Sequence, residues 1–274
     1  MNCLDVEHLT ISLFHEDRGI ARRQGCTAET GIGGRVLVHE ASFSIGTHET
    51  LAVIGSSGSG KTLTALSIMG LLDPAVFSVQ GKCSFFGTDL LPLPEKERKR
   101  YCLESIAMIY QNPFRSFSPV ETIKTHLRTL YRLKRKVPDG GLLHSLFTAV
   151  GLNMEDMLPK YPHECSGGEL QRIMIVCSLL FKPQLLICDE PSSALDFRTG
   201  MALISLLNTL KEQTGMSMLF ITHDISLIKD SADKIVIMKD GGIVEAGAAT
   251  AVFSSPQHPY TRLLIEAAYL EKPC

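Results

Sequence analysis

A glycine-rich stretch near the start of the chain has the residue types and spacing that bind phosphate groups. It matches G-x-x-x-x-G-K-[ST] at every fixed position and consists of Gly55, Ser56, Ser57, Gly58, Ser59, Gly60, Lys61 and Thr62. In this pattern backbone N–H groups surround the phosphates, the lysine reaches the β- and γ-phosphates, and the threonine hydroxyl binds Mg²⁺. At ordinary glycine usage an accidental match is expected in roughly one chain of this length per hundred. We therefore predict a site for a nucleoside triphosphate and Mg²⁺, to which Thr64 also contributes.

The segments on both sides of this stretch support the prediction. The apolar run 51–54 before it is typical of a short buried strand, and residues 63–69 after it have helical spacing. The N-terminus of such a helix carries a partial positive charge at the place where the phosphate chain would lie.

Four further polar residues lie in equivalent places, because each is found at the end of a predicted buried strand. They are Gln111 after 106–110, Asp189 and Glu190 after 185–188, and His223 after 218–221. Ligands of open α/β sheets bind at the carboxyl ends of the strands, so these side chains are expected to converge on Lys61. Taken singly, an Asp-Glu pair could be a solvated turn, a histidine a structural residue, and a glutamine carries no information.

The chemistry of phosphoryl transfer suggests a role for each residue. The reaction depends mainly on positioning and on charge stabilisation. Since Mg²⁺ takes few protein ligands, Thr62 is expected to be one of them, with Gln111 and Asp189 close to its shell. Glu190 is the candidate base that orients the attacking water.

The composition is that of an ordinary globular protein. Apolar residues make up 45% and charged residues 20% of the 274 residues, and the net charge is −2. A protein that mainly holds nucleic acid needs a basic surface, so no nucleic-acid partner is predicted. The longest apolar stretch, 173–181, is interrupted by Ser178 and is far shorter than the ~20 residues that cross a bilayer.

The cysteines and the N-terminus indicate a compartment. The eight cysteines contain no C-x-x-C pair, and Cys177 and Cys188 lie within apolar runs, where a free thiol behaves as a small hydrophobic side chain. A reduced, cytosolic environment is therefore predicted. The first residues lack the basic start and apolar middle of a secretory signal.

Strands alternate with helices along most of the chain, which favours an α/β fold with a mainly parallel core sheet. Strands are predicted at 9–14, 36–38, 41–45, 51–54, 82–86, 106–110, 185–188 and 218–221, with a late hairpin of 235–238 and 242–244. Helices are predicted at 63–69, 90–101, 123–133, 142–150, from about 166, at 199–213 and at 261–270. Residues 15–34 are predicted to be a loop.

One domain is predicted over residues 1–274. Its nucleotide-binding core comprises 1–112 and 172–250 and includes an antiparallel β-subdomain before residue 50. An α-helical subdomain, 113–171, is inserted into this core, and 251–274 form a short C-terminal extension.

Two further motifs complete a fixed order of sites: a serine with two glycines that opens a predicted helix, and an aspartate shortly after the Asp-Glu pair. They are Ser166, Gly167 and Gly168, and Asp196. With the phosphate loop and the polar strand ends they resemble the ATP-binding cassette (ABC) ATPase family over about residues 4–250. The resemblance implies the P-loop NTPase fold of that family, ATP as the nucleotide, and contact of His223 with the γ-phosphate. It also implies that Phe14 stacks on the adenine; the alternative for Phe14 is a core aromatic.

The serine and two glycines require a separate explanation. Such a helix start is an anion site, yet the chain's own phosphate loop already holds a nucleotide. In the ABC family this motif contacts ATP bound to a second subunit, so the resemblance implies a head-to-tail dimer that encloses two ATP molecules, with Asp196 at the interface. Cys165 and Glu169 replace the family's usual leucine and glutamine. Because the serine hydroxyl and the glycine N–H groups are kept, function is expected to survive.

Within the family, the chain is similar to the ATPase subunits of dipeptide, oligopeptide and nickel importers. The segments that carry this resemblance are Gln111–Pro113, Phe117–Pro119, Tyr161-Pro162 and His258–Thr261. The last of these is not required by the nucleotide site. A single cysteine near the end, Cys274, predicts no iron–sulfur cluster and favours the nickel and metal-chelate branch.

The resemblance also implies partners. A second ATPase subunit, identical or a paralogue, and two membrane permease subunits are expected, with an extracytoplasmic solute-binding protein acting indirectly. A short permease helix is expected to dock on the exposed residues 112–119, with Phe114 and Phe117 as apolar anchors. This places the protein at the cytoplasmic face of a bacterial membrane. Two alternatives remain open: a non-transport ABC ATPase, and a regulatory ATP-binding subunit with little hydrolysis.

Overall fold

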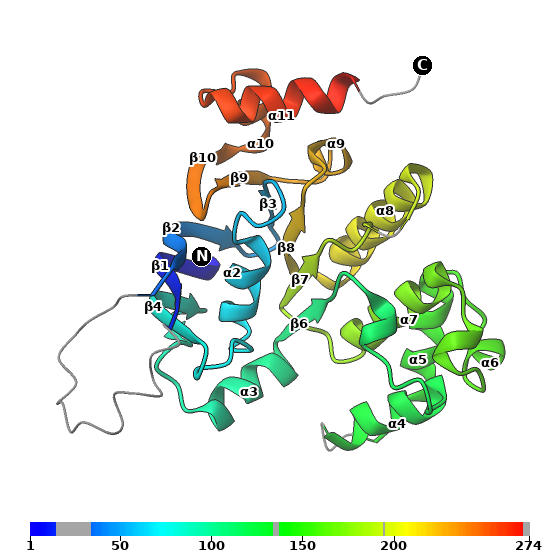
Figure 1. The fold of residues 1–274 in the computed structure, drawn as a ribbon. Coiled ribbons are helices and arrows are strands. Elements are labelled where there is room, and N and C mark those ends of the chain that lie inside the picture. The colour runs from blue at the N-terminus through cyan, green and yellow to red at the C-terminus, as the bar shows by residue number, and fades with distance from the viewer. Residues whose placement is uncertain (15–33, 134–136, 194, 271–274) are drawn as a thin grey trace, which may run out of the picture.

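The computed structural model describes residues 1–14, 34–133, 137–193 and 195–270. Within them the chain forms two β-sheets, helices that cover the larger sheet, and a C-terminal pair of helices (Figure 1). The predicted loop 15–34, except for Gly34, and the terminal Cys274 lie outside the described residues.

A six-stranded sheet forms the centre of the fold, with the strand order β10-β9-β3-β8-β7-β6. Its strands are β3 (Thr50–Ile54), β6 (Ile106–Ile109), β7 (Leu185–Asp189), β8 (Ser217–Thr222), β9 (Lys234–Lys239) and β10 (Gly242–Ala248). Strands β6, β7, β8, β3 and β9 pair in parallel, whereas β10 is antiparallel to β9. Every residue of β3, β7 and β8 is buried, as expected for parallel strands covered on both faces. The predicted mainly parallel core sheet is confirmed.

A second, antiparallel sheet has the order β2-β1-β4-β5. Its strands are β1 (Asn2–Leu13), β2 (Val36–Gly46), β4 (Phe77–Phe85) and β5 (Thr88–Asp89). Helix α2 (Lys61–Ile68) contacts β1 on one side and β7 on the other. Side chains of the antiparallel sheet, of α2 and of the facing side of the central sheet form one apolar cluster, which includes Leu9, Ile68 and Leu219. The predicted antiparallel β-subdomain is thus confirmed as a layer over α2, but it also includes β4 and β5, which follow residue 50.

The two strands predicted at 36–38 and 41–45 are in fact one strand, β2. Between them Glu40 has a φ of 44°, and the register of β2 against β1 shifts between Val6 and Leu9. Such bulges interrupt the alternation of side chains while the strand continues, which is why the sequence pattern suggested two strands.

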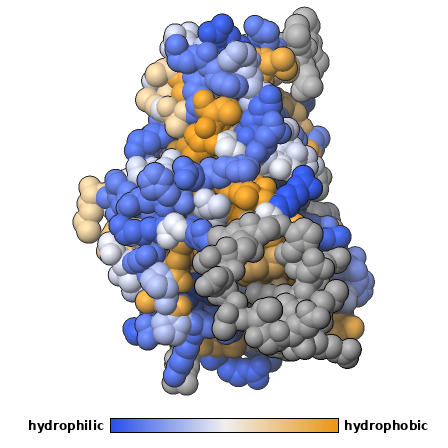
Figure 2. Space-filling model, turned by 60° about the vertical axis from the view of Figure 1, so that its left-hand side comes forward, coloured by the Kyte–Doolittle hydropathy of each residue, from blue (hydrophilic) through white to orange (hydrophobic). Residues whose placement is uncertain are grey.

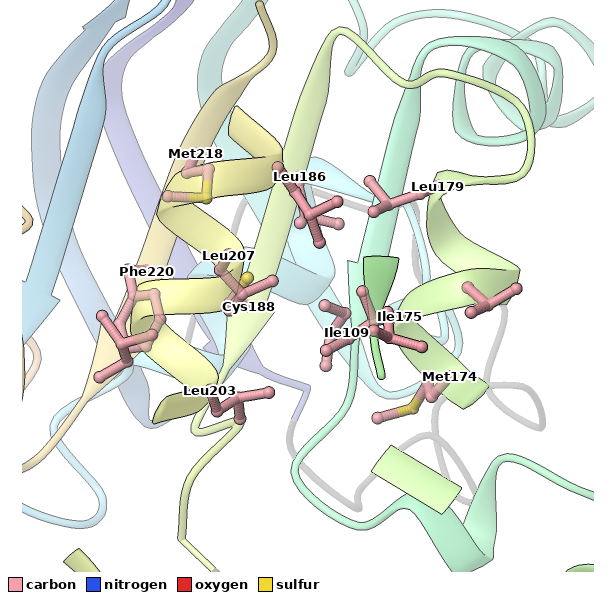
Figure 3. Packing of buried hydrophobic residues seen from close by; sticks show 14 of the residues in the cluster. Ile109, Met174, Ile175, Leu179, Leu186, Cys188, Leu203, Leu207, Met218 and Phe220 are labelled. Carbon is pink, nitrogen blue, oxygen red and sulfur yellow. The ribbon is translucent and has the colours of Figure 1, made fainter. Parts of the chain in front are cut away.

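Helices on the other face of the central sheet form a second apolar cluster (Figure 3). They are α4 (Ile123–Leu133), α5 (Gly140–Ala149), α6 (Met154–Met157), α7 (Gly167–Leu179), α8 (Phe197–Thr214) and α9 (Ile225–Ile228), with the short 3₁₀ turns η1 (Pro113–Arg115) and η2 (Pro162–Glu164). In Figure 3, Ile175 on α7 lies beside Ile109 of β6, and Leu207 on α8 lies beside Cys188 of β7. The helices from α4 to α7 lie together beside β6 in Figure 1, where the sequence predicts the inserted helical subdomain.

Helix α3 (Glu95–Glu104) begins later than the helix predicted over 90–101. Pro94 is its N-cap residue, and Pro92 precedes it. A proline inside a helix removes a hydrogen bond and clashes with the preceding turn, and it disfavours helical geometry in the residue before it. The helix therefore cannot extend back to Leu90.

The expectation that Phe117 is an exposed anchor is wrong. Phe117 is 7% exposed, and its ring packs edge-on against His126 with the ring centres 5.1 Å apart. Phe114, on η1, is 49% exposed and agrees with the expectation. The neighbouring α4 supplies the cover that the sequence around Phe117 does not reveal.

The six cysteines in the described part of the chain are free thiols. Burial raises the pKa of Cys3 to about 11 and that of Cys83 to about 12. Thiols with such pKa values are protonated at neutral pH and therefore unreactive, as the apolar surroundings of the cysteines in the sequence suggest.

The C-terminal helices α10 (Ala249–Ser254) and α11 (Pro259–Leu270) lie at the top of Figure 1, where α10 packs beside β9 and β10 and α11 contacts α9. On the face drawn in Figure 2, hydrophilic residues cover most of the coloured surface, and hydrophobic residues gather in small groups between them. Among the described residues, no helix combines the length and the apolar character needed to span a bilayer.

Truncating Leu207 tests the importance of the second cluster. Leu207 is fully buried, so Leu207→Ala removes apolar contacts and leaves a cavity, which should lower the free energy of unfolding by about 3 kcal/mol. Met201→Ala on the same helix is the control, because Met201 is 38% exposed and its loss should cost less than about 0.5 kcal/mol. Denaturant titration of both variants measures the difference; equal losses would mean that α8 packs differently.

Candidate nucleotide-binding site

The phosphate loop connects β3 to α2 and depends on glycine at three positions. Gly58 and Gly60 have φ angles of 81° and 99°, in a region that residues with a Cβ atom rarely adopt. Gly55 is needed for a different reason, because a Cβ atom there would lie 2.2 Å from the carbonyl oxygen of Met238 on β9. The loop can therefore turn sharply after the strand and lie close to its neighbour.

Several backbone N–H groups of the loop have no protein acceptor among the described residues. They belong to Ser57, Gly58, Gly60 and Lys61. A Cβ atom at Gly58 would meet nothing within 4 Å, so the space beside the loop is open. Unpaired N–H groups at the start of a helix form an anion site. The loop thus fits a chain of phosphates.

The ammonium group of Lys61 is held inside this loop. Its Nζ donates hydrogen bonds to the carbonyl oxygens of Gly55 at 2.8 Å and of Ser56 at 2.9 Å. Burial lowers the pKa of Lys61, and the nearby charges of Glu190 and Asp189 oppose this shift. The two carbonyl oxygens that bind Lys61 are neutral. Negatively charged phosphate oxygens can therefore replace them with a gain in electrostatic attraction.

The Thr62 hydroxyl donates a hydrogen bond of 3.0 Å to Oδ1 of Asp189, the last residue of β7. Asp189 is 5% exposed. Burial raises the pKa of Asp189, the charge of Glu190 adds to this, and the Thr62 hydrogen bond and Lys61 counteract it. A divalent cation beside the carboxylate favours the ionised form, so this pair is suited to hold one.

Three side chains at the ends of neighbouring parallel strands meet, and Glu190 contacts both of the others, Gln111 and His223. Its Oε2 accepts a hydrogen bond of 3.0 Å from Nε2 of Gln111 and lies 3.3 Å from Nδ1 of His223. Glu190 itself has a φ of 46°, which is uncommon for a residue other than glycine, and its N–H donates to the carbonyl of Ile221 at 2.9 Å. The strand ends therefore meet at Glu190, while Asp189 contacts Thr62, the residue after Lys61.

Ser166 is exposed at the start of α7. Its Oγ accepts a hydrogen bond from the N–H of Glu169 at 3.2 Å, and Oε2 of Glu169 accepts one from the N–H of Ser166 at 2.7 Å, which together form a capping box. Lys160 lies 3.5 Å from the same carboxylate. Within the described chain no hydrogen bond joins Ser166 to the phosphate loop, and Figure 1 shows α7 and α2 on opposite sides of β6.

Three other residues from the sequence prediction lie outside this centre. Asp196 caps α8, is exposed, and accepts hydrogen bonds from the N–H and the hydroxyl of Thr199. Phe14 follows β1 and is 37% exposed. Thr64 is buried in α2, where its hydroxyl donates to the carbonyl of Gly60 at 3.0 Å.

One contact of the phosphate loop was not predicted. The hydroxyl of Tyr260 accepts a hydrogen bond of 3.0 Å from the N–H of Ser56. Segment 258–261, which the nucleotide site was not expected to require, thus contacts the phosphate loop. No spacing rule connects residues that are 204 positions apart, and the only available signal was the His-Pro-Tyr-Thr motif itself.

These groups fit the phosphates of a nucleotide with Mg²⁺. Hydroxyl, carboxylate and amide oxygens are offered by Thr62, Asp189 and Gln111, and Mg²⁺ prefers such ligands. Among the described residues, no group of three or more His, Cys, Asp or Glu could hold a metal by itself. That suits Mg²⁺, which is usually bound through one or two carboxylates together with phosphates and waters. Fold and site together define an α/β protein with a phosphate-loop nucleotide site.

The chain belongs to the ABC transporter family, whose model matches residues 38–193. The matched segment contains the phosphate loop, Gln111, Ser166 and the Asp189-Glu190 pair.

Similar proteins of known designation cover most of the chain. The metal-staphylopine import system ATP-binding protein CntD of Staphylococcus aureus (strain Mu50) is 35% identical over 97% of this chain and 93% of its own length. The dipeptide transport ATP-binding protein DppD of Escherichia coli K12 is 37% identical over 84% of this chain and 72% of its own length. The peptidoglycan transport ATP-binding protein YejF of Agrobacterium fabrum is 42% identical over 85% of this chain, but this chain spans only 43% of the length of that protein.

Solved ABC cassettes share the fold. The dimeric post-hydrolysis structure of the cassette MJ0796 bound to ADP and Pi superposes with a TM-score of 0.72, at 21% identity, and covers 90% of this chain and 98% of its own. CbiO1 of Clostridium perfringens gives a TM-score of 0.73 at 21% identity over 99% and 96% of the two chains. The ABC ATPase fold expected from the sequence is confirmed.

Removing the Thr62 hydroxyl tests the proposed metal position. Thr62→Val deletes the donor to Asp189 and a candidate Mg²⁺ ligand, so the Mg²⁺ concentration for half-maximal nucleotide binding should rise about tenfold or more. Ser67→Ala is the matched control, because this buried hydroxyl of the same helix donates only to the carbonyl of Thr64. Calorimetric titration of AMP-PNP at graded Mg²⁺ measures the effect. If both variants show the wild-type Mg²⁺ dependence, Thr62 does not bind the metal.

Proposed function

We propose that the protein is the ATP-binding and ATP-hydrolysing subunit of a membrane ABC importer for di- or oligopeptides, or for nickel or other metal chelates. One observation carries the proposal: Glu190, held by Gln111 and His223, stands next to the Thr62–Asp189 pair at the end of the phosphate loop. This arrangement offers a base, metal ligands and a phosphate cradle together, as phosphoryl transfer requires.

Each side chain has a role that suits its position. Lys61 exchanges the carbonyls of the loop for oxygens of the β- and γ-phosphates, and Thr62 and Asp189 hold the metal. Mg²⁺, when bound, offsets the charge that develops on the phosphates. Glu190 orients the attacking water as general base, and His223, on the same carboxylate, is positioned to contact the γ-phosphate.

The start of α7 supports a dimer. Because the oxygen of Ser166 accepts the N–H of Glu169, the serine proton remains able to donate outward. A Cβ atom at Gly168 would meet nothing within 4 Å, so the helix start is open to an anion from outside. We infer that it binds ATP held by the phosphate loop of a second ATPase subunit, identical or a paralogue, with Asp196 at the interface. Phe14 would then stack on the adenine held by its own subunit.

The designations of the relatives support the solute class. CntD is named for metal-staphylopine import and DppD for dipeptide transport, and both solute classes fall within the proposal. As a subunit of such an importer the protein would bind two permease subunits at the cytoplasmic face of a bacterial membrane, with a solute-binding protein as an indirect partner. Both Glu190 and His223 are present and in contact, which favours hydrolysis over a purely regulatory role.

A groove beside η1 is the proposed permease site. A cavity of about 290 Å³ lies between β6, α4 and α7, and Tyr110, Phe117 and His126 are among its lining residues. Phe114 lies in η1, which precedes the lining residue Phe117 in the chain. The Phe114 ring is close to the start of α7, since a Cβ atom at Gly167 would lie 3.9 Å from it. A permease helix that binds Phe114 would therefore touch the same segment that binds the second ATP.

Glu190→Gln tests the ATPase proposal. The amide cannot act as a base, so phosphate release should fall about 10²- to 10⁴-fold, while ATP binding remains and an ATP-bound dimer accumulates in light-scattering measurements. Glu155→Gln is the control, because Glu155 is an exposed residue of α6; this variant should hydrolyse ATP at the wild-type rate.

The double variant Glu190→Gln/Ser166→Arg checks the dimer. The arginine side chain fills the open start of α7, so this variant should bind ATP yet remain a monomer. An unchanged hydrolysis rate in Glu190→Gln, or a dimer that persists in the double variant, would contradict the assignment of these residues.

Phe114→Ala tests the permease site. It removes an exposed ring without charging the start of α7, so binding to the permease subunits should weaken about tenfold or more, with loss of transport and unchanged AMP-PNP affinity. Leu71→Ala is the control, because Leu71 is 51% exposed on the loop after α2. Co-purification and uptake by reconstituted vesicles measure both variants. Wild-type uptake with Phe114→Ala would place the permease elsewhere.

A further inference from the structure

We propose that Tyr260 is a positioning residue of the nucleotide site, through which the C-terminal segment 256–262 sets the affinity of the protein for ATP. The inference rests on the ATP-binding function proposed above. It adds to the site a residue that lies 204 positions from the phosphate loop in sequence.

The peptide group between Gly55 and Ser56 is held from both sides. Its oxygen accepts a hydrogen bond of 2.8 Å from Nζ of Lys61, and its N–H donates one of 3.0 Å to the Tyr260 hydroxyl. When Lys61 turns to the phosphates, its hydrogen bond to the Gly55 oxygen is lost, and the hydrogen bond from the Ser56 N–H to Tyr260 remains. Tyr260 is then the side chain that keeps the beginning of the loop in place.

Tyr260 is itself fixed by the last two strands of the sheet. The carboxylate of Glu245 on β10 accepts hydrogen bonds from the N–H groups of Gln257 at 2.8 Å and His258 at 2.9 Å. Nδ1 of His258 in turn accepts the N–H of Tyr260 at 3.1 Å. The ammonium of Lys239, on β9, lies 5.2 Å from the centre of the Tyr260 ring, within the range of a cation–π interaction.

The anchoring carboxylate is ionised under neutral conditions. Burial works to raise the pKa of Glu245, but the hydrogen bonds from the N–H groups of Gln257 and His258 help to outweigh it, and the pKa is lowered. Arg262 adds two hydrogen bonds inside the segment, to the carbonyls of Pro256 at 3.0 Å and Gln257 at 3.2 Å. The hydroxyl of Tyr260 is therefore placed by a rigid turn.

This arrangement predicts an effect on binding and not on the chemical step. A loop that is already ordered loses less conformational freedom when a ligand binds, and so binds more tightly. Within the described chain Tyr260 makes no hydrogen bond to Gln111, Glu190 or His223. Its loss should therefore change the KM for ATP while the rate at saturating ATP stays within a factor of two.

Tyr260→Phe is the test, because it removes the hydroxyl and keeps the ring. Loss of one neutral hydrogen bond predicts about fivefold weaker AMP-PNP binding by calorimetry and a KM for ATP about fivefold higher. Tyr131→Phe is the matched control: it removes the hydroxyl of a buried tyrosine that, among the described residues, hydrogen-bonds to the backbone of Asp139 in the helical part of the protein. This variant should bind AMP-PNP as the wild type does.

A double-mutant cycle identifies the contact. Ser56→Pro removes the donor N–H itself. Ser56 is not among the residues with positive φ, so its φ angle has the negative sign that proline requires. In this background Tyr260→Phe should no longer weaken binding. It should instead recover part of the affinity, because the proline ring occupies the place of the N–H and crowds the hydroxyl, which lies 3.0 Å from the nitrogen.

The outcomes separate the two proposals. If wild-type protein fails to bind AMP-PNP, the proposed function is wrong. If the wild type binds and Tyr260→Phe binds equally well, only the inference about Tyr260 is wrong. A variant in which kcat falls and KM is unchanged, or an undiminished Tyr260→Phe effect in the Ser56→Pro background, would also overturn it.

Discussion

The hydrogen bond between the Thr62 hydroxyl and the Asp189 carboxylate joins the two strand–helix units that build the site. Thr62 stands in the first turn of α2, after β3, and Asp189 ends β7. Strand β8 lies between them in parallel register, with Ile54 opposite Thr222 and Asp189 opposite Ile221. A slip of one residue in either pairing would turn these side chains to the other face of the sheet. The contacts that join these strand ends, between Thr62 and Asp189 and between Glu190 and His223, depend on this register.

The site also contains groups that a stable core would avoid. Lys61 and Asp189 are ionisable and nearly buried, and Glu190 has a left-handed backbone, a conformation that costs about 1–3 kcal/mol. These costs are tolerated because apolar clusters on both faces of the central sheet hold the strand ends in place. The chemistry therefore depends on a scaffold whose packing has no direct part in it.

Local pattern was enough to predict the phosphate loop and the residues that follow β6, β7 and β8, because a parallel sheet brings its strand ends to one edge. It failed where the decisive neighbour is distant or the pattern is interrupted. Phe117 lies between exposed residues, yet α4 buries it. Tyr260 belongs to a motif whose partner lies at the other end of the domain. The start of α3 is different, because Pro94 marks it in the sequence itself.

The ion pair between Lys160 and Glu169 has a consequence for the chemistry at the start of α7. A carboxylate at this position repels an incoming phosphate, and the ammonium of Lys160 compensates for it at 3.5 Å with both side chains about one-third exposed. Mobile ions screen charges at such partly exposed positions. In the proposed dimer, added salt would therefore change how strongly the start of α7 attracts the phosphates of the second subunit's ATP, since it weakens the compensation and the repulsion to different degrees.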